Sequence, residues 1–105
     1  MNIKYNIYMS LAANIDLEEI FSYIAGTSPS EQTANNLMLK IHELILSLEE
    51  MPQRFSRSLD QTLAEKGYRR ANVKKYIILY LIDEENKTVN IARIFHSRMN
   101  YEKYI

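Results

Sequence analysis

Residues 76–82 read YIILYLI, an unbroken run of apolar residues rich in types that favour β-strands. The run has the length of an ordinary strand. A strand that is apolar at every position is buried on both of its faces. This stretch therefore predicts the central strand of a sheet, which the rest of the chain has to cover on both sides.

Three further segments are predicted to supply the neighbouring strands. Residues 68–73 (YRRANV) and 88–95 (TVNIARIF) both read as strands. Residues 83–86 (DEEN) form a turn, so the strands on either side are close enough for an antiparallel hairpin with a loop of about four to five residues. Apolar and polar residues also alternate in residues 3–9 (IKYNIYM), which predicts a short first strand.

Two helices are predicted between the first and second strands. Ser10 is placed to cap an amphipathic helix that stops at Gly26. The Ser-Pro pair at residues 28–29 then begins a second helix, and Glu31 falls where a capping box requires it. The apolar stripe of this helix ends near Glu50, because a proline follows two residues later.

The order of these elements predicts an α+β fold. A β-α-α-β-β-β chain places a helical hairpin on one face of a mainly antiparallel sheet, with a short C-terminal segment after it. Residues 51–66 are polar and are predicted to be irregular. The chain has 105 residues with only 2 glycines and 2 prolines, so we expect a single domain over residues 1–105 without a long linker.

The charge is balanced overall and unevenly distributed. Residues 1–50 hold two basic and seven acidic residues (net −5), whereas residues 51–105 hold eleven basic and six acidic residues (net +5). Five basic residues and no acid fall within residues 66–75. A one-sided basic field suits a polyanion or an acidic partner. It is equally consistent with a solvated basic strand that balances acidic helices.

Several classes of protein are disfavoured by composition. The chain has no cysteine, which excludes a disulfide framework, a thiolate nucleophile and a cysteine–zinc site. No apolar run approaches the roughly 20 residues of a membrane-spanning helix. The first ten residues also lack the pattern of a signal peptide. We therefore expect a cytoplasmic protein without a metal, a cofactor or a membrane partner.

Three segments of the chain resemble the RelE/ParE superfamily, the toxin halves of bacterial type II toxin–antitoxin pairs. They are LEEIFSYIA (17–25), ILSLEEMPQRF (45–55) and GYRRANVKKYIILYLIDEENKTVNIARIFHSR (67–98). The resemblance implies the β-α-α-β-β-β fold and a small growth-inhibiting toxin, of the kind used in plasmid stabilisation. It leaves two targets open: RelE-like members cleave mRNA on the ribosome, and ParE-like members inhibit DNA gyrase.

The resemblance also implies a partner. A cognate antitoxin is expected to neutralise the toxin in a hetero-oligomer. We expect its acidic or amphipathic tail to lie across the helical hairpin and to reach the basic side of the sheet, because such tails fold on binding.

Under the nuclease interpretation, metal-free RNA cleavage needs a base, an acid and cations that stabilise the phosphorane. The resemblance places Arg98 at a phosphate-binding position, and Arg69 on the strand where the nucleases carry lysines. His96 could supply an acid or a base, although a histidine at a strand end is more often a surface residue. The candidate catalytic residues are therefore Arg69, His96 and Arg98, and the candidate target- or phosphate-binding residues are Arg70, Lys74, Lys75, Arg93 and Tyr104.

One residue departs from the nuclease pattern. RelE-like enzymes carry an arginine directly after a tyrosine in the middle strand, but here Tyr76 is followed by Ile77, as is typical of the ParE-like branch. The sequence therefore favours inhibition of gyrase. The alternatives are a ribosome-dependent mRNA endonuclease and, in a different class, a non-catalytic protein that only binds its antitoxin and co-represses their operon.

Structural considerations also apply to three of the arginines. Arg93 alternates with Ile91 and Phe95, so we expect it on their face of the sheet, where a structural ion pair is as consistent as target binding. Arg69 and Arg70 are neighbours in a strand and should face opposite sides, so at most one of them can join a given site.

Overall fold

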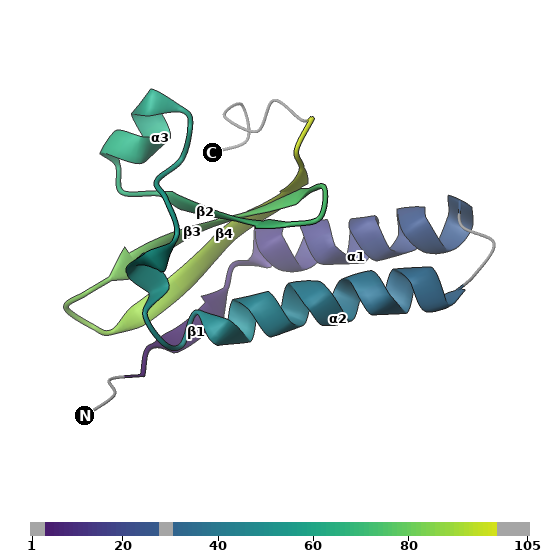
Figure 1. The fold of residues 1–105 in the computed structure, drawn as a ribbon, viewed down its shortest axis with the longest axis horizontal. Helices are drawn as coiled ribbons and strands as arrows, with labels where there is room; N and C mark the ends of the chain where they lie inside the picture. Colours follow the sequence, from purple (N-terminus) through teal and green to yellow (C-terminus); the bar gives the residue numbers. More distant parts are fainter. Residues whose placement is uncertain (1–3, 28–30, 99–105) are drawn as a thin grey trace.

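A computed structural model describes residues 4–27 and 31–98 of the chain. Two long helices lie side by side against one face of a sheet, and a short helix stands on the other side (Figure 1). The elements in chain order are β1 (Asn6–Met9), α1 (Leu11–Thr27), α2 (Glu31–Ser47), the 3-10 turn η1 (Pro52–Arg54), α3 (Gln61–Glu65), β2 (Arg69–Val73), β3 (Tyr76–Asp83) and β4 (Thr88–His96).

The sheet has four strands in the order β1-β4-β3-β2. The strands β2, β3 and β4 pair in antiparallel fashion, and β1 pairs in parallel with β4. Residues 84–87 connect β3 to β4, so the predicted hairpin is confirmed. The α+β class, the order of the main elements and the helical hairpin on a mainly antiparallel sheet are confirmed as well.

The central strand β3 is buried on both faces, as predicted, from Tyr76 to Tyr80. Its even-numbered residues pack under α1 and α2 together with Leu37, Ile41 and Ile45. Its odd-numbered residues Ile77 and Leu79 pack with Phe95 and with Leu63 of α3. The second face is therefore closed partly by a helix that the sequence did not reveal.

The prediction that residues 51–66 are irregular was wrong, because η1 and α3 form within them. The side chain of Asp60 caps α3 by accepting the backbone N–H of Leu63 at 2.9 Å. Only Leu63 of this helix is buried. A single buried residue leaves no periodic pattern that sequence inspection could detect.

Ser10 caps α1 as predicted, and it also joins the helix to the sheet. Its hydroxyl oxygen accepts the N–H of Ala13 at 2.9 Å and donates to the carbonyl of Ala92 at 2.7 Å. The expected limits of the helices shift slightly, since α1 runs one residue past Gly26 and α2 ends at Ser47 before a turn. The proposed second cap at residues 28–29 lies outside the described residues.

A β-bulge in β4 overturns the expected face of Arg93. Leu79 pairs with Arg93 while Tyr80 pairs with Ile91, so Ala92 is an extra residue in β4. An extra residue reverses the alternation of side chains beyond it. Ile91 therefore faces the helical hairpin, whereas Phe95 faces α3. Arg93 shares only the face of Phe95, with its guanidinium carbon 5.0 Å from the centre of the phenyl ring.

Tyr80 anchors η1 to the sheet. The fully buried phenol donates a hydrogen bond of 2.6 Å to the carbonyl of Pro52. Burial raises the pKa of Tyr80 to about 12, although the charges of Arg69 and Arg54 oppose the shift.

We expect Tyr80→Phe to lower the free energy of unfolding at neutral pH by about 1–2 kcal/mol, because the carbonyl of Pro52 would lose its partner. Above pH 10 the unfolded state loses the phenolic proton before the folded state does, so the stability of the native protein falls as the pH rises from 10.0 to about 12. Urea unfolding at several pH values should show that stability falls less between pH 10.0 and about 12 in Tyr80→Phe than in the native protein. An equal fall in stability in both proteins would contradict the assignment of this pH dependence to Tyr80.

Candidate functional site

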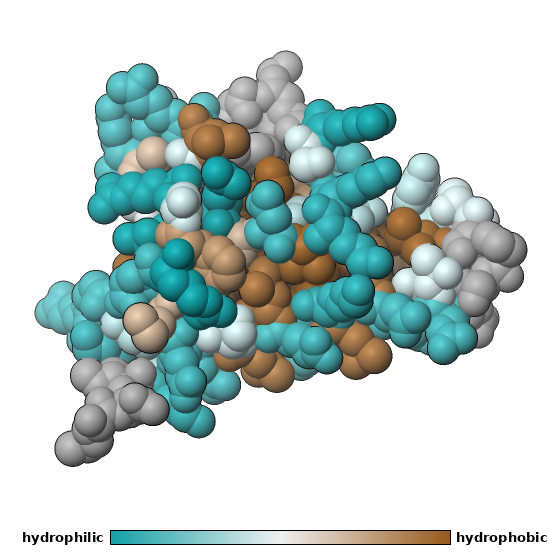
Figure 2. Space-filling view, viewed as in Figure 1, coloured by the Kyte–Doolittle hydropathy of each residue, from teal (hydrophilic) through white to brown (hydrophobic). Residues whose placement is uncertain are grey.

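The outer surface of the helical hairpin carries a shallow apolar groove, hereafter the hairpin groove. One part is lined by Leu17, Glu18, Phe21, Ser22 and Met38, and an adjoining part by Asn35, Met38, Leu39 and His42. Phe21 and Leu39, which line the groove, keep 38% and 59% of their surface exposed. Figure 2 shows that apolar side chains, in brown, reach the surface of the molecule among polar ones.

The groove arises from the sequence of the two helices. Their apolar stripes are wide, and the sheet covers only the part that includes Leu37, Ile41 and Ile45. Phe21 of α1 lies outside the covered part and stays partly exposed. An exposed apolar strip rimmed by polar residues is typical of a surface that binds a protein partner.

Arg69, a candidate catalytic residue, contacts the protein's own backbone. One guanidinium nitrogen donates to the carbonyl oxygen of Phe55 at 2.6 Å and to that of Gln53 at 3.2 Å. These bonds hold the segment after η1 against the start of β2. Its neighbour Arg70 faces the other side of the sheet, as predicted, because the two residues pair with Tyr80 and Leu79 respectively.

Arg70 has an unsatisfied group. Its Nε is buried and has no hydrogen-bond partner within the part of the chain that the structure describes. The side chain lies on the α3 face of the sheet, next to Leu79. A buried N–H without a partner is costly, so this side chain would gain free energy by turning toward an acceptor.

Arg93 forms the structural ion pair that the sequence left open. Its Nε and Nη2 each lie 2.9 Å from an oxygen of Asp16, in a bidentate arrangement. Asp16 is only 8% exposed, and the same carboxylate accepts the N–H of Ile94 at 2.9 Å. Asp16 could not be singled out by sequence inspection, because it is one of several acids along an amphipathic helix.

His96 and Arg98 lie at the turn end of the sheet. The ring of His96 meets that of Tyr76 edge-on, with centroids 5.4 Å apart, and its Nδ1 accepts the N–H of Arg98 at 3.2 Å. Arg98 is exposed. Lys74 and Lys75 form the turn between β2 and β3 and are exposed too, while Tyr104 lies outside the described residues.

The three candidate catalytic residues are not brought together. Arg69 pairs with Tyr80 and His96 pairs with Tyr76, which is four residues away on β3. That separation is about 13 Å along a strand. Ile77 is buried in the apolar cluster beside α3, so this position contributes no charge to either face.

The described residues contain no group of three or more acidic, histidine or cysteine side chains placed to hold a metal ion. None of their helices is long and apolar enough to cross a bilayer.

With this geometry established, the chain can be compared with known proteins. The family described as "ParE toxin of type II toxin-antitoxin system, parDE" matches residues 7–101. The chain belongs to the ParE toxin family. It is therefore a toxin of the type II toxin–antitoxin class, as the resemblance of its three segments implied.

Solved structures agree with this assignment. The toxin is similar to a chain of the toxin–antitoxin complex RelBE2 from Mycobacterium tuberculosis, with 25% identity, a TM-score of 0.64 and coverage of 90% of this chain and 92% of that one. It also shares its fold with a chain of the chromosomal ParDE system of P. aeruginosa, with 15% identity, a TM-score of 0.72 and coverage of 89% and 96%. No curated protein matches the sequence.

Proposed function

We propose that this toxin inhibits growth by binding DNA gyrase, in the manner of the ParE-like branch, and that it is not a nuclease. The observation that supports this most strongly is Ile77, which takes the place of a phosphate-binding arginine and is buried with Leu79 and Phe95. Restoring a cation there would require burying a charge in an apolar cluster, which is costly.

The arrangement of the arginines supports the same proposal. Stabilising a phosphorane requires several cations aimed at one point. Arg69 is bonded to backbone carbonyls, and Arg93 is paired with Asp16. Inhibition by binding a protein does not require several cations to point at one atom, because separate residues contact separate parts of the partner.

We further propose that a cognate antitoxin occupies the hairpin groove. The groove offers an apolar floor at Phe21, Met38 and Leu39, which fits the apolar face of an amphipathic helix. Both similar structures come from toxin–antitoxin systems, which supports a partner of this kind in a hetero-oligomer.

The residues that we assign to gyrase binding are those with free or exposed cationic groups. Arg70 is the leading candidate, because its half-buried side chain has an Nε without a partner among the described residues and would gain an acceptor by turning toward a carboxylate or carbonyl of the target. Lys74, Lys75 and Arg98 are exposed and can contribute at the edge of the interface. Tyr104 is retained as a candidate from its place in the sequence.

We expect Arg70→Met to weaken inhibition of gyrase about thirtyfold or more. The same change should leave the free energy of unfolding unchanged or raise it by about 1 kcal/mol, because it removes an unpaired buried N–H. Supercoiling assays and urea unfolding measure the two effects. Lys66→Met, which removes an exposed charge after α3, is the matched control. A loss of stability parallel to the loss of inhibition would contradict the assignment.

The experiment that tests the proposed target compares the effect of the toxin on gyrase with its effect on the ribosome. The purified toxin should inhibit supercoiling by gyrase, and addition of the cognate antitoxin should restore the supercoiling activity. A parallel translation reaction with primer extension should show no new RNA ends. RNA cut only when ribosomes are present would overturn the proposal in favour of the nuclease alternative. If the protein bound its antitoxin but neither inhibited supercoiling nor caused RNA cleavage, the non-catalytic co-repressor alternative would be favoured.

A further inference from the structure

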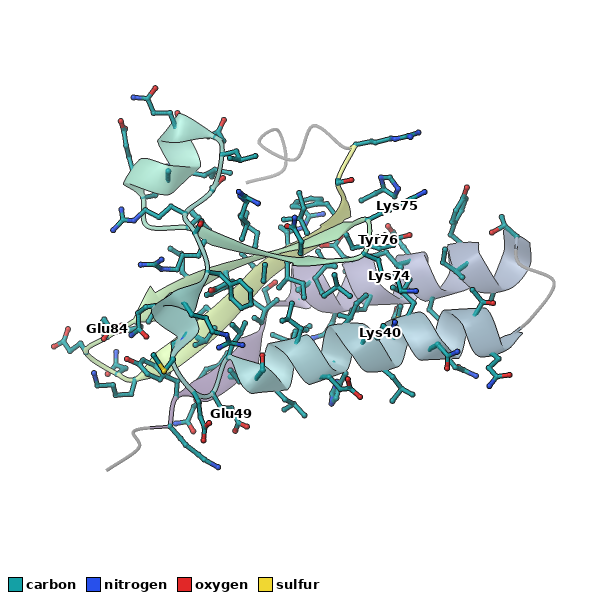
Figure 3. The ribbon with its side chains drawn as sticks, in the orientation of Figure 1. Lys40, Glu49, Lys74, Lys75, Tyr76 and Glu84 are labelled. Atoms are coloured by element: carbon teal, nitrogen blue, oxygen red, sulfur yellow. The ribbon has the colours of Figure 1, made fainter. Side chains whose placement is uncertain are left out.

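A separate groove lies where the turn between β2 and β3 meets the helical hairpin; we call it the turn pocket. It encloses about 570 Å³ and is lined by Tyr23, Ile24, Thr33, Asn36, Leu37, Lys74, Lys75, Tyr76 and His96. Figure 3 shows the labelled side chains of Lys74, Lys75 and Tyr76 at this end of the sheet. Its size falls within the range of about 300–1,000 Å³ that is usual for sites of small organic ligands.

The polar groups of the turn pocket are predominantly hydrogen-bond donors. Lys74 and Lys75 provide two ammonium groups, and none of the described lining residues is acidic. Neither lysine forms a salt bridge within residues 4–27 and 31–98. Lys40 follows Asn36 by one helical turn, so it adds a third cation on the same face of α2. Such a lining favours an anion.

The histidine of the pocket is oriented as a donor as well. The Nδ1 atom of His96 accepts the backbone N–H of Arg98. In the neutral ring the proton therefore resides on Nε2, which makes that nitrogen a donor. Burial, with a smaller effect from Tyr23, raises the pKa of Tyr76, so its phenol also stays protonated and can donate.

The walls of the pocket are aromatic and apolar. Tyr23 lines the pocket and keeps 66% of its surface exposed. Tyr76 and His96 form an edge-on pair in the same lining, to which Ile24 and Leu37 add apolar surface. An exposed tyrosine ring beside lysines is an arrangement that stacks a base while cations hold its phosphate.

We propose that the turn pocket binds a nucleoside phosphate, with the phosphates at Lys74 and Lys75 and the base against Tyr23. A bare phosphate would leave most of the volume unfilled, and an uncharged aromatic compound would leave the lysines unpaired. A ligand with both an anionic group and an aromatic ring matches both parts of the lining. This inference rests on the lining of the pocket and not on the identity of the inhibited target, although it shares Lys74 and Lys75 with the residues that we assign to gyrase binding.

Calorimetric titration of the full chain with ADP, adenosine and pyrophosphate tests the proposal. We expect saturable binding of ADP and binding of adenosine that is about tenfold or more weaker. Lys74→Glu with Lys75→Glu should reduce the affinity for ADP about a hundredfold. Tyr23→Ala should weaken ADP about tenfold while leaving pyrophosphate unaffected. Unfolding curves would confirm that these exposed substitutions leave the fold intact.

The controls separate a site from general charge attraction. Lys66→Glu with Arg57→Glu introduces the same charge change on exposed residues away from the pocket and should leave ADP binding unchanged. An equal loss in both double variants would overturn the proposal, as would the absence of saturable ADP binding. A hexaglutamate peptide that bound more tightly than ADP, and displaced it, would instead identify the pocket as a site for an acidic protein segment.

Discussion

Replacing Asp16 with alanine is expected to lower the free energy of unfolding by about 3–5 kcal/mol, because removing one partner of a buried ion pair leaves the other charge uncompensated. The change removes the carboxylate that pairs with the guanidinium of Arg93, whose side chain is only 20% exposed. It also removes the acceptor of the Ile94 N–H. Since small domains are stable by only about 5–15 kcal/mol, this variant should fold poorly.

The reason for so large an effect lies in the topology of the sheet. The strand β1 pairs with β4 only as far as Ile91. Beyond that residue no strand within residues 4–27 and 31–98 lies along this edge of β4, and the carboxylate of Asp16 accepts the N–H of Ile94 there. The ion pair therefore attaches α1 to the exposed edge of the sheet as well as neutralising Arg93.

A double-mutant cycle isolates the pair from its surroundings. Urea unfolding of Asp16→Ala, Arg93→Met and the double variant should show that the double loss is smaller than the sum of the single losses by about 1–3 kcal/mol. Asp16→Asn, which keeps an oxygen acceptor for the backbone, should cost less than Asp16→Ala. If Asp16→Ala unfolds within about 1 kcal/mol of the native protein, the pair is not the attachment described here.

The second large effect concerns the hairpin groove. We expect Leu39→Glu to weaken binding of the antitoxin about thirtyfold or more, because a charge would be buried without a partner in an apolar interface. Phe21→Ala should act in the same direction by removing an aromatic anchor. Leu39 is 59% exposed, so its replacement should leave the fold unchanged. Calorimetry with the purified antitoxin measures the change in affinity.

The same variants separate neutralisation from toxicity. A toxin with Leu39→Glu should still inhibit gyrase, and the antitoxin should no longer reverse the inhibition at concentrations that rescue the native protein. Leu59→Glu, at an exposed leucine before α3, is the matched control and should remain fully neutralised. Normal neutralisation of Leu39→Glu would place the antitoxin elsewhere on the molecule.

Much of the fold could be predicted, and the errors have identifiable causes. The apolar run of β3 and the stripe of α2 repeat at the period of their own secondary structure, so local sequence was enough to recognise them. The helix α3 was missed because one buried leucine makes no pattern. The bulge at Ala92 was missed because it depends on pairing with a strand that is distant in the sequence.

The candidate site was less predictable than the fold for the same reason. Arginine, lysine and histidine could be recognised as suitable for binding phosphate, but the role of each one depends on its neighbours in the folded protein. Arg69 donates hydrogen bonds to the carbonyls of Phe55 and Gln53, and Arg93 donates to Asp16, 77 positions away in the chain. None of these partners could be assigned from spacing.

The sequence by itself therefore determined the order of the strands and helices, the burial of β3 on both faces and the membership of the toxin superfamily, because these follow from local periodicity and from residues in fixed order. Only the tertiary structure decided which cations are engaged and which remain available. Long-range pairing set that outcome: Arg69 and Arg93 stabilise the fold, whereas Arg70 retains an unsatisfied nitrogen and Lys74 and Lys75 border an open pocket.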